Sequence, residues 1–311
     1  MRSVLVTGGA GFIGGQVARS LLEDGYQVDI VDNLSTGKPE NIPLGAEFLE
    51  LDLRFEKAVQ SLPRKAYAAI LHLAGQASGE KSFDDPLYDL DANARSTLLL
   101  ARWSLQSGVK SFIYASSMGV YGQCEQQPVQ ETADPRPVSY YGASKLSAER
   151  ILAVASSQGL RTVCFRMFNV YGPGQNLADM KQGMISIYLS QLMREKSLLV
   201  KGSLDRVRDF IYVDDVVSAW KLAVGKPVSG ILNLGTGTGT TVRDLITKLF
   251  ELCRLPDAFP VTQSSGTPGD QFAMVANIES IRKVLGWRPT VSLDQGLAKI
   301  VAWAGDLENH T

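Results

Sequence analysis

The chain has 311 residues, 45% of them hydrophobic, which is enough for one large domain or for a domain with a smaller partner. Its 31 basic and 32 acidic residues nearly cancel, and no basic stripe would draw the chain to nucleic acid or to an anionic membrane. Glycine interrupts the apolar start, and no apolar run reaches the roughly 18 residues that a membrane span needs. We therefore expect a soluble, cytoplasmic protein.

Cysteine and histidine are scarce. Cys124, Cys164 and Cys253 lie far apart and form no CxxC pair, which is typical of unpaired thiols in a reducing compartment. The two histidines are His72, which falls in a predicted strand and is expected in the core, and His310, next to the end. The chain thus offers neither a metal-ligand pattern nor a Ser-His-Asp arrangement.

The N-terminal stretch predicts a site for a dinucleotide. Residues 4–7 form an apolar strand pattern that leads into GxxGxxG, made by Gly8, Gly11 and Gly14. Missing Cβ atoms permit a tight turn, the approach of a pyrophosphate, and close contact between helix and strand. A helical pattern at residues 12–23 would then point its free N–H groups at that anion.

A second predicted strand, residues 27–31, ends at Asp32. A carboxylate in this place would accept hydrogen bonds from ribose hydroxyls and repel a 2′-phosphate, so the site would favour NAD over NADP. The alternative is a solvated acid that only closes the strand.

Strand and helix patterns alternate up to about residue 170. The further strands are predicted at residues 48–51, 68–73, 111–115 and 162–166, and the longer helices at about 87–106 and 140–157. This alternation predicts an α/β fold with a Rossmann-type doubly wound parallel sheet, whose ligand crevice lies at the carboxyl ends of the strands.

The pattern changes after Asn169, where shorter elements follow. They are a helix near 184–194, strands near 210–213 and 231–234, and a helix at 293–303. We predict an NAD-binding domain of residues 1–170, to which segments at about 209–240 return. Residues 171–311 would mainly form a smaller C-terminal α/β substrate domain. The GTGTGT run at 235–240 is interpreted as the approach to a helix capped by Thr240 or Thr241.

Tyr141 and Lys145 lie four residues apart in a predicted helix, and therefore on one face of it. The ammonium group, together with an oxidised nicotinamide, would lower the pKa of the phenol. Ser116 and Ser117 close the preceding strand, where a hydroxyl could bind the same substrate oxygen. Such a group could take a proton from an alcohol while hydride leaves for NAD. A solvated surface pair is the alternative.

Several ordered motifs resemble the extended short-chain dehydrogenase/reductase superfamily, and within it nucleotide-sugar epimerases of the UDP-galactose 4-epimerase kind. They are TGGAGFIG at 7–14, HLAGQAS at 72–78, SSMGVYG at 116–122, YxxxK at 141–145, RMFNVYGP at 166–173 and RDFIYVDD at 208–215. The resemblance runs from residue 2 to about residue 305.

The resemblance implies a role for each matching residue. Tyr141 would be the general base, Lys145 its electrostatic partner, and Ser117, four residues before Tyr121 in SxxVYG, the assisting hydroxyl. The implied cofactor contacts, besides Tyr141 and Lys145, are Gly8, Gly11, Phe12, Ile13, Gly14, Asp32, Asn33, Asp52, Leu53, Leu73, Ala74, Gln76 and Asn93. The implied substrate contacts are Ser117, Met118, Tyr141, Asn169, Arg208 and Asp270.

Two of these residues have structural alternatives. Asn169 would contact the substrate diphosphate, or could only cap a turn before Gly172. Arg208 would grip the same diphosphate with its planar fork, or could form a structural ion pair with Asp209.

Four positions bear on the substrate. Thr267 stands where the family commonly has a second arginine for the diphosphate, which puts the nucleotide in question. Met118 and Gly119 stand where dehydratases have an Asp-Glu pair, so 4,6-dehydration lacks its acid and base. Met274 falls near a position that limits the bulk of the sugar C2 substituent, where an adaptable side chain could admit an N-acetyl group.

The function implied by the resemblance is NAD-dependent epimerisation at C4 of a UDP-hexose through a transient 4-keto intermediate. Another NAD(P)-dependent change of a nucleotide sugar, by a dehydratase, decarboxylase or reductase, stays open, as does a catalytically silent NAD-binding protein. The resemblance also implies a homodimer, joined by a four-helix bundle of helices 87–106 and 140–157.

Overall fold

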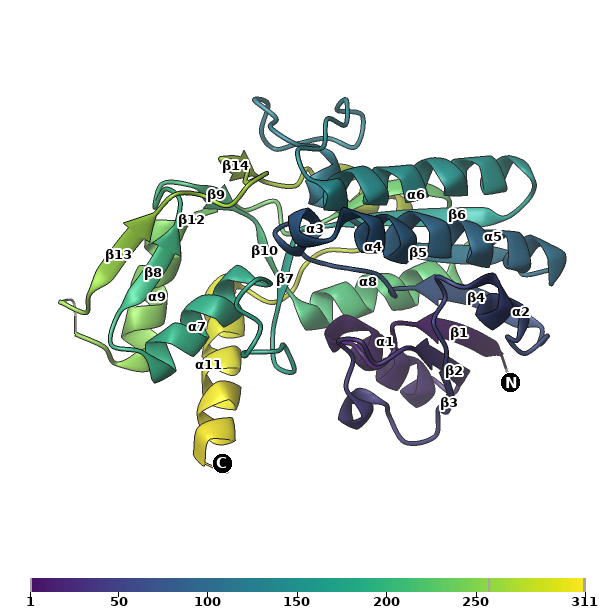
Figure 1. The fold of residues 1–311 in the computed structure, drawn as a ribbon, viewed down its shortest axis with the longest axis horizontal. Coiled ribbons are helices and arrows are strands. Elements are labelled where there is room, and N and C mark those ends of the chain that lie inside the picture. The colour runs from purple at the N-terminus through teal and green to yellow at the C-terminus, as the bar shows by residue number, and fades with distance from the viewer. Residues whose placement is uncertain (1, 257, 310–311) are drawn as a thin grey trace.

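The computed structural model describes residues 2–256 and 258–309 (Figure 1). It confirms the predicted Rossmann-type sheet, which has seven parallel strands in the order β11-β6-β5-β4-β1-β2-β3. The strands are β1 Ser3–Thr7, β2 Gln27–Asp32, β3 Glu47–Glu50, β4 Tyr67–His72, β5 Ser111–Ser117, β6 Arg161–Met167 and β11 Gly230–Leu234. The strand order reverses between β1 and β4, which is where a doubly wound sheet opens its ligand crevice.

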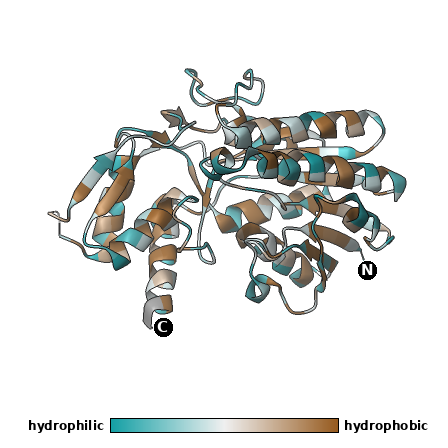
Figure 2. Ribbon diagram, viewed as in Figure 1, coloured by the Kyte–Doolittle hydropathy of each residue, from teal (hydrophilic) through white to brown (hydrophobic). Residues whose placement is uncertain are grey.

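Helices cover both faces of this sheet (Figure 1). The helices α2 Glu56–Gln60, α5 Ser96–Gln106 and α6 Tyr140–Ser157 lie on one face, and α1 Phe12–Glu23 and α8 Val213–Gly225 on the other. The alternation of β1 explains this, because Val4 and Val6 join the core that contains α1 and α8, whereas Leu5 joins the core that contains α5 and α6. Figure 2 accordingly shows hydrophobic residues along the central strands.

The helix predicted over residues 87–106 is interrupted. It consists of α4 Pro86–Leu90, the π-helical turn η2 Asp91–Arg95, and α5. The hydroxyls of Ser96 and Thr97 each donate, at 2.6 Å, to the carbonyl four residues earlier, Ala92 and Asn93 respectively. Such side-chain bonds compete with the backbone pattern of a helix. The π-helical turn places Asn93 at the crevice edge of the sheet.

A smaller part of the molecule lies beside the carboxyl ends of the strands (Figure 1). Its elements are α7 Met184–Arg194, β8 Leu198–Lys201, β9 Val207–Arg208, β12 Thr240–Thr241, α9 Val242–Cys253, β13 Val261–Ser264, β14 Ala273–Met274 and α11 Leu293–Asn309. Strands β8 and β13 pair with each other, and β9 pairs with β12 and β14. Of these strands, β8 and β9 contribute residues to the lining of the cavity described below.

The chain has six further short elements in the described ranges. They are η1 Pro39–Asn41, α3 Lys81–Asp84, η3 Met118–Val120, β7 Asn169–Tyr171, β10 Phe210–Tyr212 and α10 Glu279–Leu285. Within the predicted returning segment 209–240, β11 joins the large sheet, whereas β10 pairs with β7. The domain boundary near residue 170 stays a prediction.

Two local predictions are confirmed. His72 is fully buried, and its ring nitrogens lie 2.7 Å from the Thr7 hydroxyl and 3.1 Å from the Thr97 hydroxyl. Thr241 caps α9 by accepting a hydrogen bond from the Asp244 N–H. His310 lies outside the described residues. No helix in the described ranges is long and apolar enough to cross a membrane.

Candidate active site

The loop between β1 and α1 has the shape that a dinucleotide phosphate needs. Gly8 has a φ of +70°, and a Cβ on Gly14 would overlap the Gly8 carbonyl oxygen. Gly11 is the N-cap of α1 and makes no side-chain cap hydrogen bond, so the first N–H groups of the helix face the crevice. Phe12 and Ile13 follow in the first turn and line the cavity described below.

The other residues implied for the cofactor follow the carboxyl ends of neighbouring strands. Asp32 ends β2 and Asn33 follows it, Asp52 and Leu53 follow β3, and Leu73, Ala74 and Gln76 follow β4. Because these strands are parallel, all of these residues lie along one edge of the sheet. The structure therefore brings the predicted set together, while their contacts with a cofactor stay a prediction.

Two carboxylates of this set already have partners in the protein. Asp32 accepts hydrogen bonds from the backbone N–H groups of Ala10 at 3.0 Å and Leu34 at 2.9 Å, and burial raises its pKa. Asp52 is held by Arg54, whose Nη2 lies 2.6 Å from Oδ2. The protein therefore fixes the direction of both carboxylates.

Asn93 supplies an observation that fits a bound cofactor. Its amide nitrogen donates to Ser144 and Asp89, but its buried Oδ1 has no hydrogen-bond partner within the described chain. Gly75 lies directly beside this oxygen, and a Cβ there would clash with it. A buried acceptor without a donor is costly, and a nicotinamide or ribose donor would satisfy it. The residues present thus fit NAD.

The predicted Ser-Tyr-Lys group is assembled at the end of β5. Ser117 is the last residue of β5, and its hydroxyl accepts from the Gly119 N–H at 3.1 Å and is hydrogen-bonded to Tyr141. Lys145, one turn further along α6, has only 3% of its surface exposed. Its Nζ donates to the Ala115 carbonyl at 2.9 Å and lies 5.7 Å from the centre of the Tyr141 ring.

Burial dominates the electrostatics of this group. It raises the pKa of Tyr141 to about 12, while the hydrogen bond with Ser117 acts in the opposite direction. Burial also lowers the pKa of Lys145 to about 8, because desolvation disfavours an ammonium ion, and the carboxylate of Asp89 opposes this shift. The protein by itself therefore keeps Tyr141 protonated, and the predicted lowering of its pKa requires additional positive charge at the site.

A cavity of about 580 Å³ runs from this group toward the smaller part. At the end near α6, Ser117, Met118 and Tyr141 line it. Asn169 lines it further along, and its side-chain amide donates to the Asp209 carbonyl at 2.9 Å. The volume is in the range of small-molecule sites.

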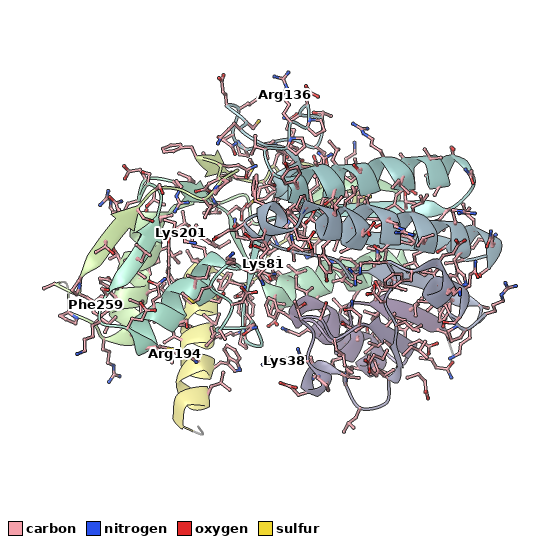
Figure 3. All side chains as sticks on the ribbon, viewed as in Figure 1. Lys38, Lys81, Arg136, Arg194, Lys201 and Phe259 are labelled. Carbon is pink, nitrogen blue, oxygen red and sulfur yellow. The ribbon has the colours of Figure 1, made fainter. Side chains whose placement is uncertain are left out.

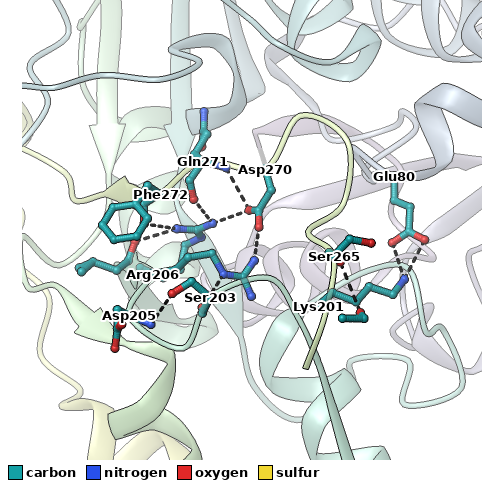
Figure 4. Close-up of polar contacts among 12 residues, drawn as sticks. Glu80, Lys201, Ser203, Asp205, Arg206, Ser265, Asp270, Gln271 and Phe272 are labelled. Carbon is teal, nitrogen blue, oxygen red and sulfur yellow. Dashed lines mark hydrogen bonds and ion pairs between the residues drawn. The ribbon is translucent and has the colours of Figure 1, made fainter. Parts of the chain in front are cut away.

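At the far end of the cavity, Arg206 and Arg208 surround one carboxylate, that of Asp270, and Figure 4 shows Arg206 and Asp270. Asp270 forms ion pairs with both Arg206 and Arg208. Backbone carbonyls of Val207, Gln271 and Phe272 also accept from Arg208 and fix its guanidinium. The alternative pairing of Arg208 with Asp209 is wrong, because Asp209 instead accepts from the loop after β11 and from the Ala276 N–H.

Arg206 is the residue that the sequence analysis missed. Its side chain is 8% exposed and lines the same cavity as Thr267, where the expected second arginine is absent. The signal was present in the sequence, because Arg206 and Arg208 are two residues apart at a strand and therefore lie on one side of it. Two cations against one carboxylate leave this end of the cavity with a net positive charge.

An ion pair bridges the two parts of the molecule at the same cavity. Glu80 follows the loop after β4, Lys201 ends β8, and the two groups approach to 2.9 Å (Figure 4). Lys81 pairs with Asp179 at 2.6 Å on the same side, and Figure 3 shows Lys81 near the boundary between the two parts and Lys201 in the smaller part. These pairs connect the loop after β4 to the far side of the cavity.

The expectation for Met274 is wrong. Strand β14 pairs with β9, and this turns Met274 into a small core with Val120, Tyr121 and Phe168, where it is fully buried. Its side chain is not part of the cavity lining. Met274 therefore gives no information about the C2 substituent.

Known proteins resemble the whole chain. The sequence model of the "NAD dependent epimerase/dehydratase family" matches residues 4–235. A UDP-glucose 4-epimerase of Mycolicibacterium smegmatis is 33% identical over 305 residues, which cover 96% of each chain. The crystal structure of a Thermotoga maritima UDP-glucose 4-epimerase with UDP-glucose is 38% identical, with a TM-score of 0.93 and coverage of 98% and 99%.

The structure of a Thermus thermophilus UDP-glucose 4-epimerase in complex with NAD is 37% identical, with a TM-score of 0.90, and the match covers 97% of this chain and 99% of that one. The likeness thus extends beyond the parallel sheet to the smaller part. Together with the glycine loop and the Ser117, Tyr141 and Lys145 group, it confirms the resemblance found in the sequence. The chain belongs to the NAD dependent epimerase/dehydratase family.

Proposed function

We propose that the chain is an NAD-dependent epimerase that inverts C4 of a UDP-hexose through a transient 4-keto sugar. The observation that carries this proposal is that the two ends of one cavity have different chemistry. Ser117, Tyr141 and Lys145 lie at or behind one end, and Arg206 and Arg208 lie at the other. A nucleoside-diphosphate sugar fits this arrangement, because its hexose can lie beside the acid–base group while its diphosphate lies beside the arginines. The names of the relatives support the same substrate.

The side chains would divide the work as follows. Tyr141 takes the proton of the C4 hydroxyl and later returns it, while Ser117 holds the reacting oxygen. Lys145 stabilises the phenolate by its charge. Bound NAD supplies a centre that accepts and returns a hydride, so that the reaction has no net redox change. The glycine loop, Asp32 and Asn93 are the residues that would hold it.

Arg206 and Arg208 would bind the diphosphate. A planar guanidinium can donate two parallel hydrogen bonds to phosphate oxygens. We infer that Arg206 supplies the second cation in place of the arginine absent at Thr267, and that Asp270 orients both guanidinium groups. Asn169 would add a neutral contact between the hexose and the arginines.

The site gives no support to a 4,6-dehydratase. Met118 and Gly119 follow Ser117 and line the cavity, so neither position has a carboxylate to protonate a leaving oxygen or to take a carbon-bound proton.

The test is to incubate the protein with NAD in D₂O, separately with UDP-glucose, UDP-N-acetylglucosamine and UDP-glucuronate, and to read the products by NMR. We expect a C4-inverted product without deuterium, because the hydride returns internally. Deuterium in the ring or a decarboxylated product would contradict the proposal and point to another reaction of the 4-keto sugar. If the protein converts none of the three UDP-sugars, this result would contradict the proposal as well.

We also propose that two chains form a homodimer through α4, α5 and α6. Apolar side chains are exposed along these helices, among them Leu87 at 76%, Leu98 at 42% and Val154 at 60%. Burial of such a stripe against its copy would stabilise a four-helix bundle. Light scattering should give the mass of two chains, and Leu98→Glu with Val154→Glu should halve it, whereas Leu44→Glu, an exposed leucine elsewhere, should not. A monomeric wild type would contradict the proposal.

The cytoplasmic location stays a prediction.

A further inference from the structure

Asp89 is a buried carboxylate next to the catalytic group that the mechanism above does not use. It lies in α4 with no exposed surface. Three side chains donate to it: Gln76 at 2.7 Å, Ser144 at 2.5 Å and Asn93 at 3.3 Å. Burying a carboxylate is costly unless it has partners, so a residue in this position needs a reason.

The donors of Asp89 connect it to the site from the loop after β4, from η2 and from α6. Gln76 and Asn93 are both among the residues expected to contact NAD, and Ser144 directly precedes Lys145 in α6. Asn93 also donates to the Ser144 hydroxyl at 3.1 Å, which closes the network. A displacement of Asp89 would therefore move both predicted cofactor ligands together.

The charges around Lys145 identify its electrostatic partner. The neighbouring His72 is neutral, because burial lowers its pKa to about 3, and burial keeps the pKa of Tyr114 well above its ordinary value. The carboxylate of Glu149 is already paired with Arg166 at 2.7 Å. Within the described chain this leaves Asp89 as the acid that balances Lys145.

We propose that Asp89 is a positioning residue: its carboxylate fixes Gln76, Asn93 and Ser144, and its negative charge sets the protonation of Lys145 and Tyr141. The inference rests on the proposed function, because it assigns a role in the same reaction. Burial lowers the pKa of Lys145, and the charge of Asp89 opposes this by favouring the ammonium form. Burial raises the pKa of Tyr141, and the same charge adds to this by disfavouring the phenolate form. Asp89 thus sets the pH range in which Tyr141 and Lys145 have the protonation states that the reaction needs.

The variant Asp89→Asn removes the charge and keeps the size of the side chain. Loss of a nearby negative charge lowers the pKa of both Tyr141 and Lys145. Both limbs of the profile of kcat against pH, the acidic and the basic one, should therefore move to lower pH by about one unit. NAD retention after gel filtration should also fall, because the orienting acceptor for Gln76 and Asn93 is weakened. The smaller neutral variant Asp89→Ser should give the same shift if Asp89→Asn does not fold.

The matched control is Asp215→Asn. Asp215 is a buried aspartate that accepts from Thr290 and Val291, in α8 on the other face of the sheet. The Asp215→Asn variant should be less stable than the wild type and leave both limbs of the pH profile of kcat unchanged. If Asp89→Asn only lowers kcat without moving the limbs, its role is structural and the proposal is overturned.

A second readout does not depend on a substrate. The tyrosinate absorbance of NAD-bound wild type minus that of Tyr141→Phe follows the ionisation of Tyr141 alone. Repeating this difference in an Asp89→Asn background should give a lower pKa for Tyr141, and an unchanged or raised value would overturn the proposal. A wild type that converts no UDP-sugar would contradict the proposed function and leave this titration as a valid test of Asp89.

Discussion

At the scale of single residues, the chemistry depends on one phenol. The change Tyr141→Phe removes the group that takes the C4 proton and leaves the ring packing intact. We expect turnover to fall by about 10³-fold, within the range of general acid–base catalysis, while NAD content and melting temperature stay near those of the wild type. The measurement is initial rate by coupled assay together with the NAD released on denaturation.

The neighbouring tyrosine provides the control. Tyr140 precedes Tyr141 in α6, is half exposed and does not line the cavity. Tyr140→Phe should keep the wild-type rate. A Tyr141→Phe enzyme with substantial turnover would remove this residue from the mechanism.

A second residue-scale prediction concerns the diphosphate. Arg206→Met keeps an apolar side chain of similar length, but removes one of the two cations beside Asp270. We expect KM for the UDP-sugar to rise on the order of tenfold with little change in kcat, because a lost charge-assisted hydrogen bond weakens ground and transition state alike. Steady-state kinetics checks this.

Two further variants sharpen the test. Thr267→Arg in the Arg206→Met background restores a cation to the same cavity and should recover part of the affinity. Arg243→Met removes an exposed arginine that pairs with Asp205 outside the cavity, and should leave KM unchanged. An unchanged KM in Arg206→Met would show that Arg206 serves only to hold Asp270.

At the scale of elements, the sequence predicted those with a strong local pattern. The strands of the parallel sheet are buried on both faces and therefore read as apolar runs, and α1 and α6 have clear helical spacing. Helix α8 was missed because it begins at Val213, directly after β10, with no turn residue between them. Here the acidic pair Asp214 and Asp215 in the first turn was the available signal.

The same holds for the site, where residues with a local sequence pattern were predicted and residues without one were not. Ser117, Tyr141 and Lys145 were predictable because two of them share a helix face and the third ends a strand that the fold brings alongside. Asp89 and Arg206 were not singled out, since their importance comes from contacts between segments distant in the sequence, such as Arg206 with Asp270. The burial of Met274 likewise follows from the pairing of β14 with β9, which no local pattern reveals.

The start of α9 allows a prediction at this scale. The sequence left Thr240 and Thr241 open as its cap, and in the structure the Thr241 hydroxyl accepts from the Asp244 N–H at 3.0 Å. Thr241→Ala should lower the free energy of unfolding by about 1 kcal/mol, because it leaves a backbone donor of the first turn unsatisfied. Thr240→Ala should cost less than half of that. Urea unfolding compares the two, and equal losses would contradict the assignment of the cap.

At the scale of the whole molecule, the buried histidine couples folding to pH. His72 lies in β4 at the centre of the sheet, and burial lowers its pKa to about 3, well below the ordinary value near 6.5. The folded state therefore keeps His72 neutral at pH values where the unfolded chain binds a proton. The stability from this group is complete above pH ~6.5 and is lost progressively as the pH falls toward about 3.

The variant His72→Gln can keep polar contacts with Thr7 and Thr97, but it does not titrate. Between pH 7 and pH 5 the wild type should lose about 2 kcal/mol of unfolding free energy more than this variant does, since one proton binds only to the unfolded chain. Thr97→Val, which removes a hydroxyl partner of the ring but keeps the histidine, should be less stable at both pH values and retain the wild-type slope. Equal slopes for wild type and His72→Gln would mean that His72 is protonated in the folded state, and that Thr7 and Thr97 then act only as acceptors.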